Sequence, residues 1–307
     1  MDGILNINKP GGKTSFSVVA MVKRLSGERR VGHAGTLDPI ATGVLPVCLG
    51  QGTRIVQFLL NATKTYRAQI ELGVATDTYD ASGKITHQGD PSGINKNQLE
   101  LALAPFRGLI RQTPPMYSAV KYKGQRLYEL ARAGIRVEPK SRPVKIYSLD
   151  IIDWQPPVVT VEVECGKGTY IRSLAHDLGQ SLGCGASLKS LIRLRYGPFD
   201  IKTAFSIPQL EDAFRYGYWQ HFLHPIDTVL LHWRAIVVNN TTENIIKKGA
   251  PVVLENDNEG ITSSLESPSE SSLSETHCRT YTLDGNFIGV LRSNPERTQW
   301  QPEKVFR

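Results

Sequence analysis

The order of the strand-like segments sets the strongest limit on the fold of this chain. In Lys64–Leu72, apolar and polar residues alternate with the period of two that is typical of a strand with one buried face. Further strands are predicted at residues 4–8, 44–49, 117–122, 144–152, 158–164 and 279–290. Helical stretches near residues 98–104, 126–133 and 171–182 do not alternate regularly with these strands, as βαβ units would require. The sequence therefore predicts an α+β fold with a mixed, mostly antiparallel sheet.

The N-terminal part of the chain is predicted to contain two helices and a loop. Thr14 or Ser15 can cap the first helix, and Gly27 suits its C-terminal end. Residues 31–39 contain two glycines and one proline and predict a loop. Residues 54–60 predict a second, short helix.

A change in composition divides the chain into two predicted domains. Residues 255–276 contain six acidic residues and seven serines but no lysine or arginine, which is typical of a flexible loop or insertion. Strand-like alternation resumes after this loop. We therefore expect a large domain at residues 1–232. A small β-rich domain is expected at residues 233–307, and the acidic, Ser-rich loop interrupts it.

The net charge of +7 is unevenly distributed between these two parts. Residues 233–307 carry 8 basic and 10 acidic residues, so residues 1–232 carry 28 basic and 19 acidic ones. Basic surfaces attract polyanions because lysine and arginine release counterions from phosphates. A nucleic-acid partner would therefore bind mainly to the first part.

The sequence contains no pattern that calls for a metal, a nucleotide cofactor or a membrane. The four cysteines form no C-x-x-C pair, and we expect them to be free thiols in a reducing cytoplasm. A phosphate-binding P-loop ending at Gly12-Lys13 would need a glycine at position 7, which is Ile7. No apolar run approaches the roughly 20 residues that a bilayer span needs. We expect a cytoplasmic protein without cofactor or metal.

Residues 32–46 form the segment most suggestive of chemistry, and they read GHAGTLDPIATGVLP. Taken alone, Asp38 in a glycine-rich loop is more often a turn former that accepts bonds from nearby backbone N–H groups. A lone histidine such as His33 is likewise more often structural than catalytic. The chemical interpretation depends on the whole segment.

The segment closely resembles the active-site motif of the TruB family of pseudouridine synthases. The resemblance continues in KTY at residues 64–66, GVATDTYDASG at 73–83, QTPPMYSAVK at 112–121 and CGKGTYIRSLAHDLG at 165–179. It covers most of residues 1–230 and is close to the branch that acts on uridine 55 in the T loop of tRNA. It implies a pseudouridine synthase fold, tRNA as the partner, and isomerisation of uridine without a cofactor.

The resemblance also implies roles for single residues. Asp38 aligns with the catalytic aspartate of the family, and Tyr66 aligns with the tyrosine that stacks on the target base. Tyr170 and Arg172 align with the pair that contacts the site of that aspartate. His33 aligns with the histidine that helps to hold RNA with the target nucleotide flipped out.

Other candidate residues depend on less specific signals. Leu191 is a candidate apolar wall of the pocket. Phosphate contacts are expected from basic residues, each of which could equally be a solvated surface charge: Lys13, Lys64, Arg107, Arg111, Lys121, Lys123 and Arg126. Residues 245–252 resemble part of the PUA-like domain that follows the catalytic domain in this family, although the region is acidic here.

The expected chemistry explains why the resemblance places an arginine beside an aspartate. Aspartate is ionised at neutral pH, but burial in a dry pocket raises its pKa. A neighbouring arginine opposes this rise and can hold the carboxylate by paired hydrogen bonds, which is the role expected of Arg172. Tyr66 can stack on an extruded base or be part of the strand core.

Two other functions stay open at the level of sequence. One is a non-catalytic tRNA-binding chaperone on the same scaffold, and the other is a pseudouridine synthase that acts on another RNA. A chaperone would have no need of Asp38, Tyr66, Tyr170 and Arg172 together. Nothing in the sequence requires a protein partner, and we expect a monomer.

Overall fold

The computed structural model describes residues 1–254, 276–294 and 299–306. By compactness the chain divides into a first unit, Met1 with Gly3–Leu223, and a second unit, Asp2 with His224–Arg307. Along the chain, the boundary between the units lies nine residues before the boundary that composition predicts. In this intervening segment, Asp227 accepts a hydrogen bond of 2.6 Å from the hydroxyl of Tyr281 in the second unit. The Ser-rich loop predicted at residues 255–276 lies, except for Thr276, outside the described residues.

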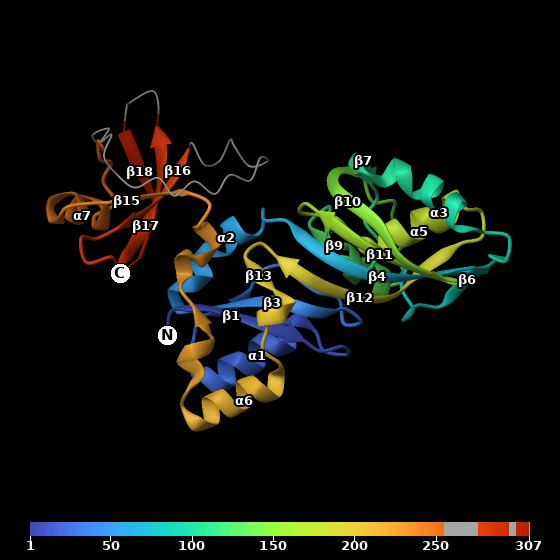
Figure 1. Cartoon of the computed structure of the whole chain (residues 1–307), viewed down its shortest axis with the longest axis horizontal. Helices are drawn as coiled ribbons and strands as arrows, with labels where there is room; N and C mark the ends of the chain where they lie inside the picture. Colours follow the sequence, from blue (N-terminus) through green and yellow to red (C-terminus); the bar gives the residue numbers. More distant parts are fainter. Residues whose placement is uncertain (255–275, 295–298, 307) are drawn as a thin grey trace. The chain divides into compact units, whose positions relative to one another are not determined.

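The first unit is built around a ten-stranded sheet with the order β14-β1-β3-β12-β4-β11-β10-β7, in which β13 also pairs with β12 and β2 with β3 (Figure 1). Its strands are β1 (Gly3–Lys9), β2 (Val31–His33), β3 (Thr42–Leu49), β4 (Lys64–Leu72), β7 (Gly108–Gln112), β10 (Arg142–Gln155), β11 (Val158–Cys165), β12 (Ala186–Tyr196), β13 (Phe199–Asp200) and β14 (Leu223–His224). The pair β12–β3 is parallel, whereas the pairs of β1, β2, β4, β10, β11 and β13 with their registered partners are antiparallel. The predicted α+β class with a mostly antiparallel sheet is confirmed.

The helices of the first unit are α1 (Ser15–Ser26), α2 (Val56–Leu59), α3 (Lys96–Leu103), α4 (Leu127–Arg132), α5 (Ile171–Ser181) and α6 (Ile207–Tyr216). Short 3-10 segments lie at Gly50–Ile55, Ala104–Phe106, Ile201–Thr203, Trp219–Phe222 and Ile226–Leu230. Helix α5 buries Leu174 and Leu178 completely, together with strand residues such as Val161 and Ile70. Burial of a leucine side chain stabilises the fold by about 1.5–3 kcal/mol.

Helix α1 has the caps that its sequence predicts. The hydroxyl of Thr14 accepts a hydrogen bond of 3.0 Å from the backbone N–H of Ser17. At the other end, Gly27 has a φ of 65° and its N–H donates to the carbonyl of Lys23. A residue without a Cβ adopts this left-handed conformation at low cost.

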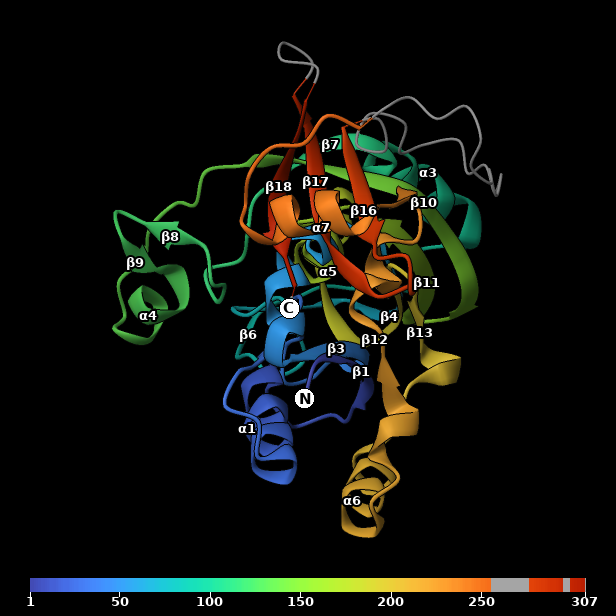
Figure 2. The same cartoon turned by 90° about the vertical axis from the view of Figure 1, so that its left-hand side faces the viewer.

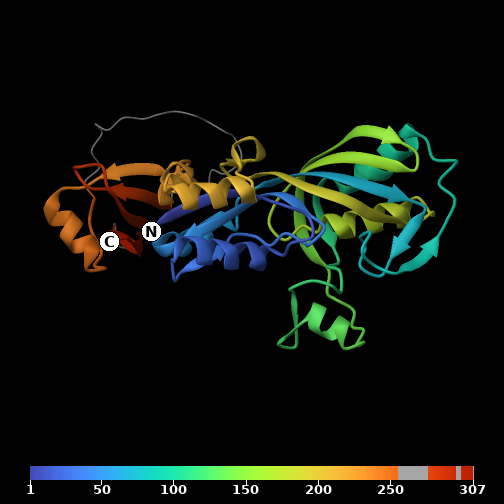
Figure 3. The same cartoon turned by 90° about the horizontal axis from the view of Figure 1, so that it is seen from below.

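Two small two-stranded sheets extend from the first unit: β5 (Val74–Thr76) with β6 (Ile85–Gln88), and β8 (Lys121–Tyr122) with β9 (Gln125–Arg126). Figure 2 and Figure 3 show β8, β9 and α4 projecting away from the ten-stranded sheet. The strand predicted at 117–122 is wrong except for its last two residues. The carbonyls of Ser118 and Val120 accept hydrogen bonds from Tyr128 and Leu127, so this backbone holds the start of α4 instead of a sheet.

The prediction of a loop at residues 31–39 is wrong at its start, because β2 pairs with β3 over Val31–His33. Strand β12 was not predicted at all. Its pairing with β4 has register shifts between Leu188 and Ser190 and between Arg193 and Arg195. Such bulges interrupt the alternation of apolar and polar residues that identifies a strand in a sequence.

The second unit contains a four-stranded sheet with the order β15-β16-β17-β18 and one helix, α7 (Asn240–Lys247). The strands are β15 (Arg234–Val237), β16 (His277–Tyr281), β17 (Phe287–Asn294) and β18 (Gln299–Val305). Its core includes Ile246 from the helix and Cys278 and Leu291 from the strands, all fully buried. The predicted small β-rich C-terminal domain is confirmed.

Candidate active site

Asp38 lies in the loop between β2 and β3, and both of its neighbours in the chain are held by hydrogen bonds. The hydroxyl of Ser15 donates to the carbonyl of Leu37 at 3.1 Å and accepts from its N–H at 2.9 Å. The carbonyl of Pro39 accepts bonds from the N–H of Gly12 at 2.8 Å and from Nζ of Lys9 at 3.5 Å. The start of α1 and the end of β1 therefore fix the backbone on either side of Asp38.

Arg172 on α5 binds the carboxylate of Asp38 with two parallel hydrogen bonds. Its Nε donates to Oδ2 at 2.9 Å, and its Nη2 donates to Oδ1 at 3.1 Å. The side chain of Arg172 is 4% exposed, whereas that of Asp38 is 35% exposed. The guanidinium thus lies beneath the carboxylate and holds it in one orientation, while the carboxylate itself stays accessible.

The remaining partners of Arg172 come from two further segments. Its guanidinium donates to the carbonyls of Thr78 at 3.1 Å and Tyr117 at 3.0 Å. A second carboxylate, that of Asp80, lies 3.7 Å from Nε and is also buried. Asp80 accepts further bonds from the hydroxyl of Thr78 and the N–H of Ser82. This buried arginine is therefore surrounded by acceptors, as a buried charge requires.

The electrostatics of Asp38 combine opposing effects. Burial raises the pKa of its carboxyl above the ordinary value, and the charge and hydrogen bonds of Arg172 oppose this rise. The negative charge of Asp80 adds to the rise in pKa. Without Arg172, Asp38 would hold its proton to a higher pH.

Tyr66 lies on β4, directly opposite Arg193 on β12 and Val163 on β11. Its partly buried ring packs against the hydrophobic core. Burial raises the pKa of its hydroxyl, and the positive charge of Arg193 opposes this rise. The structure thus gives Tyr66 a position in the strand core, and stacking on a base stays a prediction.

Tyr170 is the N-cap residue of α5, and hydrogen bonds of its backbone hold it in place. Its N–H donates to Oε1 of Gln112 at 2.8 Å, and its carbonyl accepts from Nε2 of the same residue at 3.0 Å. The guanidinium of Arg142 lies over its ring, 5.2 Å from the centroid. Within residues 1–254, 276–294 and 299–306, its hydroxyl makes no hydrogen bond to Asp38.

His33 and Leu191 lie on strands close to this site. His33 is on β2, and burial together with the charge of Arg193 lowers the pKa of its imidazole. Its buried Nδ1 has no hydrogen-bond partner in the described part of the chain. Leu191, 6% exposed on β12, belongs to the hydrophobic core and pairs with Ala68 of β4.

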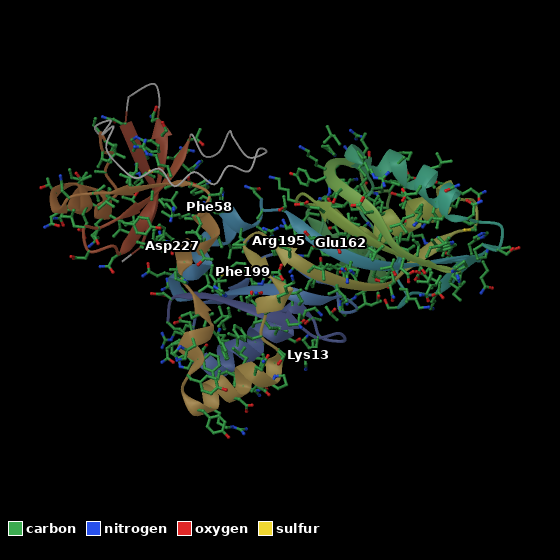
Figure 4. The ribbon with its side chains drawn as sticks, in the orientation of Figure 1. Lys13, Phe58, Glu162, Arg195, Phe199 and Asp227 are labelled. Atoms are coloured by element: carbon green, nitrogen blue, oxygen red, sulfur yellow. The ribbon has the colours of Figure 1, made fainter. Side chains whose placement is uncertain are left out.

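The two predicted phosphate contacts differ sharply in their surroundings. Lys13 is exposed in the loop between β1 and α1 (Figure 4). Lys64 is buried, and its Nζ donates to the carbonyls of Leu60 at 2.9 Å and Ala62 at 2.5 Å. Burial lowers the pKa of Lys64 to about 8. Because Lys64 is buried and two of its three N–H groups already bind carbonyls, it is less suited to a phosphate contact than Lys13.

Sequence reasoning missed three buried charged residues near Asp38, namely Lys9, Asp80 and Arg193. Nζ of Lys9 donates to the carbonyls of Pro10 and Lys13, and burial lowers its pKa to about 8. Asp80 lies in the matching segment 73–83, which was a usable signal. Lys9 directly follows the strand predicted at residues 4–8 and is the last residue of β1, and a lysine at such a position gives no sign in the sequence that it is buried.

The described residues contain no group of three or more His, Cys, Asp and Glu side chains that could hold a metal ion. In the same part of the chain, no helix has both the length and the apolar character needed to cross a membrane.

The model of the TruB family pseudouridylate synthase N-terminal domain matches residues 23–171, and that of the tRNA pseudouridylate synthase B C-terminal domain matches residues 172–231. The chain belongs to the TruB family. The first of these matches contains Asp38, Tyr66 and Tyr170, and the second begins at Arg172. The family assignment from the sequence is confirmed, and this TruB-family member is a pseudouridine synthase, an isomerase.

Two bacterial relatives share this assignment over most of their length. A "tRNA pseudouridine synthase B" of Dehalococcoides mccartyi strain BAV1 is 44% identical over 306 residues, which cover 100% of this chain and 97% of the relative. A protein of the same name from Clostridium acetobutylicum is 46% identical over 252 residues, covering 82% and 86% of the two chains. Among solved structures, a chain in the "Crystal Structure of a Cbf5-Nop10-Gar1 Complex" is 27% identical with a TM-score of 0.73, covering 99% of this chain and 85% of that one.

Proposed function

We propose that this TruB-family enzyme converts the uridine at position 55 in the T loop of tRNA to pseudouridine, with Asp38 as nucleophile and without a cofactor. The relatives named tRNA pseudouridine synthase B, at 44% and 46% identity, support tRNA as the substrate. The observation that carries the catalytic part is the accessible carboxylate of Asp38, which Arg172 holds by two hydrogen bonds.

The reaction breaks the bond from N1 of uracil to C1′ of ribose and joins C5 of the same base to C1′. The hydrogen on C5 leaves as a proton, and no electrons are gained or lost overall. One anionic oxygen beside the ribose is therefore sufficient. The Asp38 carboxylate can attack covalently or take a proton from the sugar, and Arg172 opposes the rise in pKa that burial causes.

The target base must leave the stacked loop before Asp38 can reach its ribose, at a cost of a few kcal/mol. We assign Tyr66 to stacking on the flipped base, since an aromatic face recovers part of this cost. His33 and Leu191 would line the space that the nucleotide enters. Tyr170 is positioned by Gln112, and we assign its hydroxyl to the proton that leaves C5.

Phosphates of the tRNA would bind to the basic first part of the chain, where 28 basic residues outnumber 19 acidic ones in residues 1–232. The exposed Lys13 beside the Asp38 loop suits such a contact. We propose residues 1–232 as the catalytic domain and residues 233–307 as a PUA-like domain, in a cytoplasmic monomer.

The test is tritium release from an unmodified tRNA transcript labelled at C5 of uridine, because forming the C5–C1′ bond expels that hydrogen. We expect release by the wild type, also in the presence of EDTA. A matched transcript with cytidine in place of the T-loop uridine should release none. Release from both transcripts would contradict the assigned position, and a loss in EDTA that zinc restores would contradict the metal-free mechanism.

The same experiment separates the enzyme from a non-catalytic chaperone. If the wild-type protein binds the transcript but releases no tritium, catalysis on this tRNA is excluded and the chaperone function is favoured. If it releases tritium only from another RNA, the reaction stands and the tRNA substrate does not.

A further inference from the structure

Arg193 is a fully buried arginine with an unusual set of partners. It lies on β12, is 1% exposed, and donates from Nε to the carbonyl of Val44 at 2.7 Å and from Nη2 to the carbonyl of Gly35 at 3.1 Å. Gly35 precedes Asp38 by three residues and Val44 follows it by six. One guanidinium therefore ties together both ends of the loop that presents Asp38.

The place of Arg193 in the sheet connects this loop to Tyr66. On one side of β12, Arg193 is the Cα partner of Tyr66 in β4, and on the other side it is the partner of Gly43 in β3. Gly43 has a φ of +99°, and a Cβ built on it would lie 2.3 Å from the carbonyl oxygen of Arg193. The backbones are thus packed too closely at this point for a larger residue at position 43. The sheet fixes the distance from Tyr66 to the backbone of residue 193, and the side chain of Arg193 extends this connection to the Asp38 loop by its bonds to the carbonyls of Gly35 and Val44.

The charge of Arg193 is stabilised by an aromatic ring instead of a carboxylate. Its guanidinium lies over the buried ring of Tyr196, 4.8 Å from the centroid, and Nζ of Lys64 lies 4.5 Å from the same centroid. Among the described residues, no Asp or Glu forms a salt bridge with Arg193. A desolvated cation over an aromatic ring gains about 2 kcal/mol or more, which helps to offset its burial.

We propose that Arg193 is a positioning residue for the isomerisation, which holds the Asp38 loop at a fixed distance from Tyr66 by binding the carbonyls of Gly35 and Val44. This inference rests on the proposed roles of Asp38 and Tyr66 in that reaction. Arg193 does not touch the substrate in this account. It acts through the loop backbone, so its loss should slow the chemical step more than it weakens the binding of tRNA.

The test compares three variants in single-turnover tritium release, with enzyme in excess over labelled transcript, and measures tRNA affinity and thermal unfolding on the same preparations. Arg193→Met removes the charge and both bonds. Arg193→Lys keeps a cation but loses the planar fork that reaches two carbonyls. Arg195→Met is the matched control, because Arg195 is exposed on the same strand (Figure 4). In the described part of the chain, its side chain donates only to the carbonyl of Gly197.

We expect the single-turnover rate constant to fall about 100-fold in Arg193→Met, the effect expected when reacting groups shift by about 1 Å. The single-turnover rate constant of Arg193→Lys should be at least about tenfold lower than that of the wild type, while its melting temperature stays near the wild-type value. Affinity for tRNA should change less than about threefold in both. If Arg193→Met does not fold, Arg193→Lys alone decides the question.

Several results would overturn the inference. A rate constant for Arg193→Lys equal to that of the wild type would mean that the two-carbonyl contact is not needed. An equal loss in Arg195→Met would mean that general charge on this strand matters instead. A loss confined to affinity would make Arg193 a binding residue. If the wild type itself releases no tritium, the proposed reaction fails, which is distinguishable from failure of the Arg193 role in an active enzyme.

Discussion

Two buried arginines bind the Asp38 loop, and they hold it in different ways. Arg172 on α5 binds the side chain of Asp38 and lies 3.7 Å from a second carboxylate, Asp80. Arg193 on β12 binds the backbone at the two ends of the loop and stacks on Tyr196. In the proposed reaction, the first arginine would orient the carboxylate of Asp38 and favour its ionised form, and the second would position the loop that carries Asp38.

The difference has a direct electrostatic consequence. Arg172 is close enough to act on the pKa of Asp38, whereas Arg193 acts on the pKa of Tyr66, His33 and Lys9. Changes at the two arginines should therefore slow the reaction with different pH dependence.

Of the changes that test this comparison, Arg172→Met is expected to have the largest effect. Removing one partner of a buried ion pair costs the fold about 3–5 kcal/mol. We expect a loss of about 4 kcal/mol in the transition state as well, which slows turnover about 10³-fold. Because Arg172 lowers the pKa of Asp38, its removal raises that pKa, so less carboxylate is ionised at a given pH. The acid limb of the kcat profile, measured from about pH 5 to about pH 9, should move to higher pH.

Asp80→Asn is the matched variant with the opposite electrostatic sign. Asp80 raises the pKa of Asp38, so removing its charge should move the acid limb to lower pH. If the acid limb of the kcat profile moves in the same direction in both variants, or in neither, then Arg172 and Asp80 do not act on the pKa of Asp38 in opposite directions.

A smaller effect is expected at Tyr66, the residue that faces Arg193 across the strands. Stacking of a base on an aromatic ring contributes about 1–3 kcal/mol, so Tyr66→Leu should slow single-turnover release by about 10- to 100-fold. Tyr66→Phe keeps the ring and should lose less. Wild-type rates in both variants would leave Tyr66 with its core role alone.

The smallest effect concerns stability and the lysine that shares the ring of Tyr196 with Arg193. The pKa of Lys64 is lowered to about 8 in the folded chain, and in the unfolded chain it is near 10.4. Below about pH 8, Lys64 is protonated in both the folded and the unfolded state, and the folded state bears the full cost of burying its charge. Between about pH 8 and about pH 10 only the unfolded state keeps its proton, so the wild type should gain stability with rising pH.

Chemical denaturation of the wild type and Lys64→Met across this range measures the effect, and Lys9, which has a similar pKa, contributes equally to both proteins. The difference in free energy of unfolding should change by on the order of 1–2 kcal/mol in favour of the wild type. A difference that stays constant with pH would mean that the burial of Lys64 does not perturb its titration.

The sequence was sufficient to predict the ion pair between Asp38 and Arg172. Asp38 and Arg172 stand in long motifs, and the chemistry of a buried carboxylate calls for an arginine beside it. Arg193 could not be predicted in the same way, because its partners are backbone carbonyls that can belong to any residue. Its strand was also missed, since two bulges interrupt the alternation in Ala186–Tyr196.

Local sequence patterns predicted secondary structure well but did not predict which lysines are buried. Strand Lys64–Leu72 and helix α1 follow local rules of alternation and capping, and the structure has both where they were predicted. Whether a lysine is buried depends on long-range packing, which is why Lys13 and Lys64 looked alike in sequence although one is exposed and the other is buried.

The most direct test of the central role given to Asp38 is tritium release from C5-labelled tRNA by the wild type and by Asp38→Asn, with tRNA affinity measured on both proteins. Asparagine keeps the size of the side chain but cannot supply the anionic oxygen. We expect release by the wild type, no measurable release by the variant, and nearly unchanged affinity. Release by Asp38→Asn within tenfold of the wild-type rate would contradict the role of Asp38 as the nucleophile.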